Sequence, residues 1–464
     1  MQSGYHCAMI PDPKWLDALK LPLKVTIAVA LASLALLALD SFNGKIYPIN
    51  PRLKSIGKLP CYPSLSAIED VIDLALICVG GPSVSDAMNE CAASGIRAAI
   101  IFAAGFKELG EAGEAAQDEI RRIADSNHIA VIGPNCLGAG NIPLDLNATF
   151  FPQPIAQKKG TVSIISQSGG VCGLMLYAAG DTNVGISKFV SVGNRVNIEF
   201  HDLLRYFKDD DKTQVICVFI EGIESGRELY ESIKEITQRK PVIAFKVGKT
   251  PVSREAAYSH TGSLAGRAEV YSGAIKQAKG IEVESVEEMM DTAKILSMTT
   301  AKPHGRSVAI VTHTLGVALI AAQTLEENSI HLPQPPQEAQ DQIQGLLGMP
   351  VQVPIRNPID LLAQGWADPD IFAKSFEIIA KQKEFDAIMT VFAPNYLEGI
   401  GGGMPVRSII ETARKYPKLV VSVLSSPVTR RPPGAKELED GGIPVFTEPQ
   451  RAGRALANVL RCYS

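Results

Sequence analysis

Residues 161–171 read Thr-Val-Ser-Ile-Ile-Ser-Gln-Ser-Gly-Gly-Val, an apolar strand that leads directly into a turn of small polar residues and glycines. A helical pattern follows the turn. A strand that is apolar throughout is typical of a parallel sheet, because helices cover both faces of such a sheet. Ligands of open α/β sheets bind at the carboxyl ends of the strands. The stretch therefore predicts a parallel α/β fold and a candidate ligand site at residues 166–170.

The same alternation of strands and helices continues in both directions from this stretch. The predicted strands are 45–49, 73–79, 98–102, 129–132, 161–165, 215–220, 241–246, 307–311, 385–392 and 419–424. The predicted helices are 84–94, 113–127, 286–298 and 449–461. This pattern predicts an α/β fold of three doubly wound domains, over residues 42–150, 158–300 and 305–464, with a linker near 302–305.

Residues 1–41 do not follow this alternation, because Val25–Leu39 is almost unbroken apolar. At 15 residues this segment is shorter than the ~20 residues that a membrane-spanning helix needs. A cleavage pattern of the A-x-A type, which would mark a signal peptide, does not clearly follow it. We therefore expect a buried element of the first domain, with a membrane or export role as the alternative.

The composition is that of a globular protein from a reducing compartment. The 464 residues carry a formal net charge of −4 and are 46 % hydrophobic, so the charge gives no indication of a nucleic-acid partner. The eight cysteines form no CxxC pair and have no metal-ligand spacing, and several lie in apolar runs. We expect a cytoplasmic protein without a metal site of its own.

The turn after residue 165 is a candidate anion site. Ser166, Ser168, Gly169 and Gly170 open a helix, where free backbone N–H groups and the positive end of the helix dipole favour phosphate. The structural alternative is that Ser166 or Ser168 caps the helix and that the glycines allow close packing. The motif alone does not decide between these two interpretations.

Two residues suit catalysis by their type and setting. Glu221 directly follows strand 215–220, where a carboxylate either points into a site or remains solvated. His260 lies in the polar segment Ser259-His260-Thr261-Gly262, whereas the other histidines lie in helix, strand or linker contexts. A neutral imidazole is a competent nucleophile near pH 7, although a lone histidine is more often structural.

A fourth candidate is the turn at residues 133–138, Gly-Pro-Asn-Cys-Leu-Gly, which follows the last strand of the first predicted domain. Its composition indicates a turn. Its position at the carboxyl end of a strand indicates a ligand loop.

Together these motifs resemble, in order and spacing, those of the α subunits of ADP-forming acetyl-CoA synthetases and, more distantly, of succinyl-CoA synthetase. The resemblance extends from about residue 42 to the C-terminus. Its motifs are Tyr47–Pro51, Gly133–Cys136, Leu146–Phe150, Ser166–Gly170, Ser191–Asn194, Ser259–Gly262 and Asn357–Leu361. The resemblance implies a Rossmann-like CoA-binding domain followed by two flavodoxin-like CoA-ligase domains.

The resemblance also implies roles for individual residues. His260 matches the histidine that is phosphorylated in the family, and Glu221 matches the glutamate that orients and stabilises phosphohistidine. The residues that match the helix start holding the transferring phosphate are Ser166, Ser168, Gly169 and Gly170. The residues that match contacts with CoA are Asn50, Pro51, Arg52, Pro82, Ser83, Gly105, Phe106, Asn135 and Cys136.

The activity that the resemblance implies is that of an acyl-CoA synthetase of the NDP-forming kind. Such an enzyme interconverts acyl-CoA, ADP and phosphate with a carboxylic acid, CoA and ATP through a phosphohistidine. The chain shows no ATP-grasp module. The resemblance therefore implies a separate ATP-grasp β subunit that holds ATP or ADP with Mg²⁺, in an α2β2 assembly.

Two features depart from the pattern of the family. Its members begin with a strand and a glycine-rich turn that binds the CoA phosphates, whereas residues 1–41 contain only Gly4. Residues 79–82 read Val-Gly-Gly-Pro, where the family often has Val-Pro-Ala-Pro. The alternatives to an active subunit are a regulatory module that binds acyl-CoA and an inactive remnant, although His260 and its loop are retained.

Overall fold

The computed structural model describes residues 25–28, 35, 38–39, 41–151, 158–253, 267–349, 353–393, 403–426 and 431–463. The chain divides into two compact units, Met1–Val286 and Glu287–Ser464. Each unit has buried apolar clusters of its own. Among the described residues, no helix combines the length and apolar character needed to cross a bilayer.

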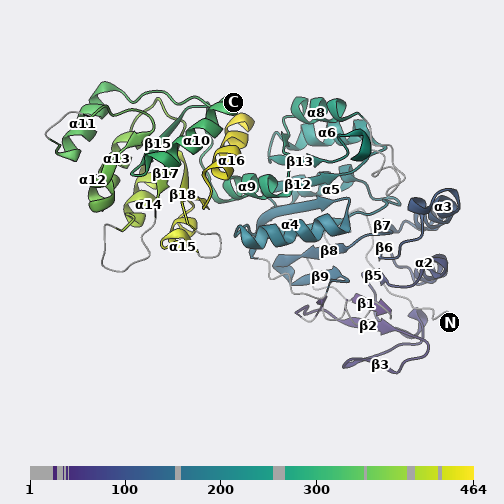
Figure 1. The fold of residues 1–464 in the computed structure, drawn as a ribbon. Coiled ribbons are helices and arrows are strands. Elements are labelled where there is room, and N and C mark those ends of the chain that lie inside the picture. The colour runs from purple at the N-terminus through teal and green to yellow at the C-terminus, as the bar shows by residue number, and fades with distance from the viewer. Residues whose placement is uncertain are drawn as a thin grey trace. The chain divides into compact units, whose positions relative to one another are not determined.

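The first sheet of the first unit is parallel, with the strand order β2-β1-β5-β6-β7. Its strands are β1 (Val25–Ala28), β2 (Ile46–Ile49), β5 (Leu74–Ile77), β6 (Ala98–Ile101) and β7 (Ala130–Ile132). Helices α2 (Val84–Ala93) and α3 (Glu111–Ser126) lie beside β5, β6 and β7 (Figure 1). A short antiparallel pair, β3 (Ser55–Ile56) and β4 (Leu59–Pro60), follows β2.

Strand β1 occupies the interior of this sheet, between β2 and β5. Its residues Val25, Thr26 and Ile27 pair in parallel with residues 74–76. Ala35 and Leu39, later in the same apolar segment, are at most 1 % exposed. The described part of the segment agrees with the expected buried element, and the sheet begins before residue 42, where the sequence placed the start of the first domain.

The second sheet is mixed, with the strand order β14-β13-β12-β10-β11-β8-β9. Its strands are β8 (Gly138–Asn141), β9 (Leu146–Thr149), β10 (Lys159–Ser166), β11 (Ile186–Ser191), β12 (Val215–Ile220), β13 (Val242–Lys246) and β14 (Ile281–Glu282). Strands β8 and β9 run antiparallel to their neighbours. Residues 138–149, which the sequence pattern assigned to the first domain, thus belong to the second sheet. The glycine-rich strand β8 has no apolar run that would have indicated this.

The helices of this part are α4 (Gly169–Asp181), α5 (Phe200–Asp209), α6 (Gly226–Ile236) and α8 (Ala268–Gln277). Helix α5 illustrates how the sequence determines where such a helix begins and which of its faces is buried. Glu199 and Asp202 form a capping box at its start, and Phe200, Leu203, Leu204 and Phe207 are buried. These four apolar residues recur at the spacing of one helix face, so α5 buries that face against the sheet.

The second unit contains one parallel sheet, with the strand order β16-β15-β17-β18-β19. Its strands are β15 (Val308–Thr312), β16 (Ile359–Asp360), β17 (Ala387–Phe392), β18 (Leu419–Leu424) and β19 (Val445–Phe446). Its helices are α9 (Val286–Met298), α10 (Leu315–Glu327), α11 (Gln337–Leu347), α12 (Leu362–Ala367), α13 (Pro369–Ala380), α14 (Val406–Lys415), α15 (Ala435–Asp440) and α16 (Pro449–Cys462).

Helix α9 has the predicted bounds. The sequence placed it in the second predicted domain (158–300), but nearly all of it belongs to the second compact unit. Its Asp291 accepts two hydrogen bonds of 2.8 Å from Arg451 of α16. The three main sheets with their helices confirm the predicted α/β fold of three doubly wound domains (Figure 1).

Candidate functional site

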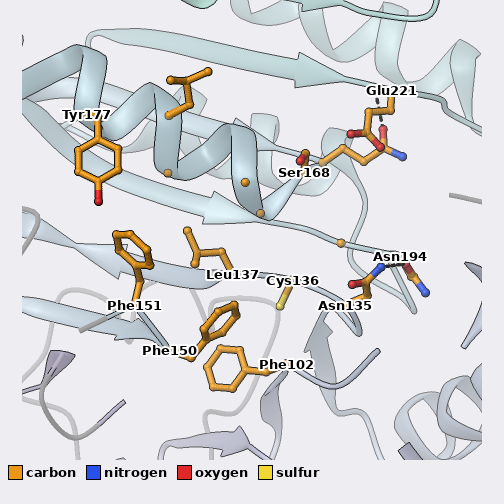
Figure 2. Close-up of a pocket in the computed structure, with 16 residues that line it drawn as sticks. Phe102, Asn135, Cys136, Leu137, Phe150, Phe151, Ser168, Tyr177, Asn194 and Glu221 are labelled. Carbon is orange, nitrogen blue, oxygen red and sulfur yellow. Dashed lines mark hydrogen bonds between the residues drawn. The ribbon is translucent and has the colours of Figure 1, made fainter. Parts of the chain in front are cut away.

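A cavity of about 710 Å³ lies within the first unit. Its lining comes from segments that follow the carboxyl ends of β6, β7, β10, β11 and β12, and from helix α4 and the end of β9. The lining residues are Phe102, Asn135, Cys136, Leu137, Phe150, Phe151, Gln167, Ser168, Gly169, Gly170, Gly173, Leu174, Tyr177, Gly193, Asn194 and Glu221. This is where ligands bind in open α/β sheets, as the strand pattern predicted (Figure 2).

Helix α4 begins at the wall of this cavity. Ser168 is its N-cap, and the Ser168 Oγ accepts a hydrogen bond of 3.3 Å from the Val171 backbone N–H. Ser166 is fully buried, and its hydroxyl donates to the Ser168 carbonyl over 2.7 Å. A Cβ atom at Gly169 would lie 3.2 Å from the Leu137 nitrogen, so glycine permits this close approach. The capping and the ligand interpretations of the motif are thus compatible.

Gln167 joins the start of α4 to the turn that follows β12. Its Oε1 atom accepts hydrogen bonds from the Glu221 N–H over 2.8 Å and from the Gly222 N–H over 3.0 Å. The side chain is 4 % exposed, and its Nε2 group is buried with no hydrogen-bond partner in the described part of the chain. Gln167 therefore positions Glu221 and retains a donor that an oxygen of a ligand can use.

Lys246, at the end of β13, supports the same turn from the other side. It is 1 % exposed, and its Nζ donates to the Glu221 carbonyl over 2.8 Å. The ammonium group also lies 4.8 Å from the centre of the Tyr271 ring. Burial lowers the pKa of Lys246 to about 8, although the negative charge of Glu221 raises it. The backbone at Glu221 is thus held by a cation that can lose its proton in mildly alkaline solution.

The loop at residues 133–137 is clamped between β6 and β11. Asn135 N–H donates to the Ala103 carbonyl, and Asn194 N–H donates to the Pro134 carbonyl, both over 2.9 Å. Gly193 has a φ of +56°, and a Cβ atom there would lie 2.2 Å from the Pro134 oxygen. Only glycine fits this position, because both its backbone conformation and its surroundings exclude a side chain.

The Asn194 side chain also contacts the segment that follows β6. Its Nδ2 group donates to Glu108 Oε2 over 2.6 Å and to Gln117 Oε1 over 3.0 Å. The other carboxylate oxygen of Glu108 accepts from the Gly105 N–H over 2.6 Å. Burial raises the pKa of Glu108, but the hydrogen bonds from Gly105 and Asn194 outweigh it and lower the pKa overall.

One end of the cavity is aromatic. The Phe102 and Phe150 rings meet edge to face with their centres 5.5 Å apart, and the Phe151 and Tyr177 rings do so at 6.0 Å. Leu174 on α4 adds an apolar side chain that is 53 % exposed. The positions of Leu174 and Tyr177 give no sequence signal, because they look like ordinary surface positions of a helix.

The structure brings six of the residues proposed from the sequence into one cavity: Asn135, Cys136, Ser168, Gly169, Gly170 and Glu221. Ser166 lies directly behind this wall. The Cys136 thiol is buried and donates to the Ile101 carbonyl over 3.4 Å, and its burial raises its pKa. Cys136 is therefore a packing group of the wall rather than a thiolate.

Seven of the other proposed residues lie outside the lining of the cavity. Asn50, Pro51 and Arg52 follow β2, Pro82 and Ser83 follow β5, and Gly105 and Phe106 follow β6, all at the carboxyl edge of the first sheet. Phe106 is 1 % exposed, and the Asn50 Oδ1 atom accepts from the Arg52 N–H over 2.8 Å. His260 lies outside the described residues. Among the residues described, no three His, Cys, Asp or Glu side chains could together hold a metal ion.

Known proteins share both the sequence and the fold of this chain. Two family models match it: a CoA binding domain over residues 30–141 and a succinyl-CoA ligase like flavodoxin domain over residues 159–296. The α subunit of acetate–CoA ligase (ADP-forming) II of Pyrococcus furiosus is 32 % identical over 423 residues, which are 89 % of each chain.

A longer relative and a solved structure extend this comparison. Acetate–CoA ligase (ADP-forming) I of Archaeoglobus fulgidus is 33 % identical over 92 % of this chain, which spans only 59 % of that relative. The structure of acetyl-coenzyme A synthetase 1 of Ca. Korarchaeum cryptofilum, in complex with phosphate and ADP, aligns with a TM-score of 0.82 and 31 % identity. That alignment covers 93 % of this chain and 92 % of the other.

Proposed function

Since the chain belongs to the family of ADP-forming acetate–CoA ligases, we propose that it is the subunit of such an enzyme that binds CoA and carries the phosphohistidine. The observation that carries this proposal is the cavity in which the start of α4, the Gln167 donor and Glu221 converge. An anion, a group that orients an imidazole and an acyl group can all be held there together.

The proposed reaction has three steps, and the first two need only this chain. An oxygen of phosphate attacks the thioester carbonyl of acyl-CoA, and the thiolate of CoA leaves and takes up the phosphate proton, which produces an acyl phosphate. A ring nitrogen of His260 then attacks the phosphorus, and the carboxylate of the acid leaves. In a third step, ADP takes the phosphoryl group from His260 and becomes ATP, so the imidazole acts as a nucleophile and as a carrier.

The first unit supplies the electrostatic part of this chemistry. The start of α4, at Ser168, Gly169 and Gly170, offers backbone N–H groups and the positive end of the helix dipole to the moving phosphoryl group. Catalysis of phosphoryl transfer depends mainly on such positioning and charge stabilisation. The Gln167 Nε2 group adds one further donor to the same wall.

In this proposal Glu221 accepts a hydrogen bond from one nitrogen of His260, so that the other nitrogen is free to attack. A carboxylate in this role fixes the tautomer and stabilises positive charge on the ring. The support of the Glu221 backbone by Gln167 and Lys246 restricts where its carboxylate can lie. A carboxylate held in this way requires less reorganisation during the reaction.

The first sheet suits the binding of CoA. The segments at Asn50–Arg52, Pro82–Ser83, Gly105–Phe106 and Asn135–Cys136 all follow the carboxyl ends of its parallel strands. We propose that CoA lies along this edge with its thiol directed to the cavity. An ATP-grasp β subunit would hold ADP or ATP with Mg²⁺, in an α2β2 assembly and in the cytoplasm.

The test is a half-reaction that needs no partner subunit. The chain is incubated with radiolabelled phosphate and one thioester in each of three parallel reactions. The thioesters are acetyl-CoA, phenylacetyl-CoA and succinyl-CoA, and the label bound to protein is measured. Acid-labile, base-stable label in the wild type and none in His260→Asn are the expected results. His128→Asn is the matched control, because His128 is exposed and its φ of +54° is one that asparagine tolerates. Absence of label with every thioester would reject the proposal.

A further inference from the structure

The two ends of the cavity differ in chemistry. Figure 2 shows Ser168, Glu221, Asn135 and Asn194 gathered at one end and the rings of Phe102, Phe150, Phe151 and Tyr177 at the other. The polar end contains the helix start and the buried Gln167 donor, so it suits the carboxyl carbon and the phosphate. The aromatic end offers no polar group for that chemistry, so it suits a different, apolar part of the ligand.

The part of the aromatic end formed by helix α4 is an accessible surface and not closed core. Leu174 is 53 % exposed and Tyr177 is 45 % exposed, although both line the cavity. Large apolar side chains that line a cavity and remain accessible mark a place where an apolar ligand is buried. The edge-to-face pair of Phe151 and Tyr177 suits contact with a planar group, whereas Phe102 of the other pair is 6 % exposed and belongs to the core.

Charge restricts the occupant further. Among the lining residues that the structure describes, none is Lys, Arg or His, and Glu221 is the sole carboxylate. A second carboxylate on the acid would lose hydration against these apolar side chains without a counter-ion among the described lining residues, which disfavours it. A methyl group, in turn, would occupy only a small part of the cavity of about 710 Å³.

We propose that the aromatic end receives the hydrocarbon part of the acyl group, so that the acid is an aryl or bulky branched monocarboxylate rather than acetate or a dicarboxylate. This inference rests on the proposed function, since it assigns the acyl part of the same reaction. Leu174, Tyr177 and Phe151 are the specificity-determining residues, because they contact the part of the acid in which these substrates differ.

The experiment compares rates of the half-reaction on the purified chain. Labelled phosphate is supplied with acetyl-CoA, phenylacetyl-CoA, isovaleryl-CoA or succinyl-CoA, and CoA release is followed by chromatography beside the label on His260. Phenylacetyl-CoA and isovaleryl-CoA are expected to react at least about tenfold faster than acetyl-CoA, and succinyl-CoA slowest, because each buried apolar carbon contributes to discrimination. Equal or faster reaction of acetyl-CoA or succinyl-CoA would overturn the inference and leave the proposed function standing.

A variant locates this selectivity in the aromatic end. Leu174→Trp fills the cavity from a half-exposed position of α4, so the fold is retained, which the circular dichroism spectrum checks. The ratio of the phenylacetyl-CoA rate to the acetyl-CoA rate is expected to fall by about tenfold. Leu319→Trp on α10, where Leu319 is 52 % exposed, is the matched control and is expected to leave the ratio unchanged.

The pantetheine arm of CoA is the competing occupant of the aromatic end. If the arm lay there, Leu174→Trp would slow the reactions of all four thioesters by the same factor and raise the KM of each alike. That outcome would overturn the inference. Absence of label with every thioester, by contrast, is the separate result that rejects the proposed function.

Discussion

Lys188 and Lys246 are both 1 % exposed, but their charges are balanced in different ways. Lys188 forms an ion pair of 2.6 Å with the fully buried Asp210. Lys246 donates to backbone carbonyls and lies over the Tyr271 ring. Burial disfavours the charged form of a lysine that has no carboxylate as a direct partner, and accordingly the pKa of Lys246 falls to about 8.

We predict that Lys246 makes stability depend on pH. Its pKa is about 8 in the folded chain, whereas a fully solvated lysine, as in the unfolded chain, has a pKa of 10.5. The unfolded state therefore binds more protons between these two pH values, and the free energy of unfolding rises as the pH increases from about 8 to 10.5. Lys246→Met should reduce this rise, measured by urea unfolding at several pH values.

The control for this experiment is Lys58→Met, because Lys58 is an exposed lysine of the same unit. It should retain the rise of the wild type. A Lys246→Met variant whose stability follows the same pH profile as the wild type would show that the lysine is protonated equally in both states.

A second residue-scale prediction concerns Gly193, whose φ is +56° and whose added Cβ would lie 2.2 Å from the Pro134 oxygen. Gly193→Ala should destabilise the first unit by more than the roughly 1–2 kcal/mol of the left-handed conformation alone, and it should abolish the phosphohistidine label. Gly57→Ala is the matched control, since Gly57 has the same φ of +56° with nothing within 4 Å of its added Cβ. Equal thermal shifts in the two variants would contradict the close approach.

At the scale of elements, helix α4 has its capped end at the wall of the cavity. Its N-cap hydroxyl stabilises the first turn, and the same turn forms the polar wall of the cavity. Ser225 occupies the corresponding place at α6, but its side chain makes no capping hydrogen bond. The two helices therefore allow the contribution of the cap to be measured within one unit.

We predict that Ser168→Ala lowers the free energy of unfolding by about 1 kcal/mol, because the Val171 N–H loses its acceptor. Ser225→Ala should cost distinctly less in the same urea titration. Phosphohistidine formation in Ser168→Ala should also require a higher phosphate concentration. A loss of stability in Ser225→Ala as large as in Ser168→Ala would contradict the assignment of the cap.

At the scale of the whole molecule, each of the two units contains a buried ion pair. Asp210 and Lys188 lie in the first unit, and Glu439 and Lys294, also 2.6 Å apart, lie in the second. Removal of one partner of a buried ion pair costs about 3–5 kcal/mol, because the remaining charge loses its counter-ion. Because each unit has its own core, each pair reports on the stability of its own unit.

We therefore predict two transitions in differential scanning calorimetry of the full chain. Asp210→Ala should lower the temperature of one transition, and Glu439→Ala should lower the temperature of the other. The two variants serve as controls for each other, since the ion pairs have the same length and similar burial. A single transition would show that the units unfold together, and a shift of both transitions by a single variant would show that their stabilities are coupled.

The sequence by itself determined the elements with strong local signals. Strand β12 (215–220), strand β18 (419–424) and helix α9 (286–298) have the predicted bounds, because continuous apolar runs and helical periodicity are local properties. The α/β fold and the strand-to-helix turn that begins α4 follow from such patterns. The position of Glu221 directly after a strand allowed either a site or a solvated carboxylate, and the structure places it in the lining of the cavity.

Only the tertiary structure decided which distant segments meet. Strand β8 joins the second sheet by antiparallel pairing with β11, and its glycines gave no apolar signal for this. Phe102 and Phe150 form one aromatic pair although they lie on separate segments, and the lowered pKa of Lys246 arises from its burial, which outweighs the opposite effect of Glu221. These features depend on contacts between residues far apart in the chain, and a local pattern carries no information about such contacts.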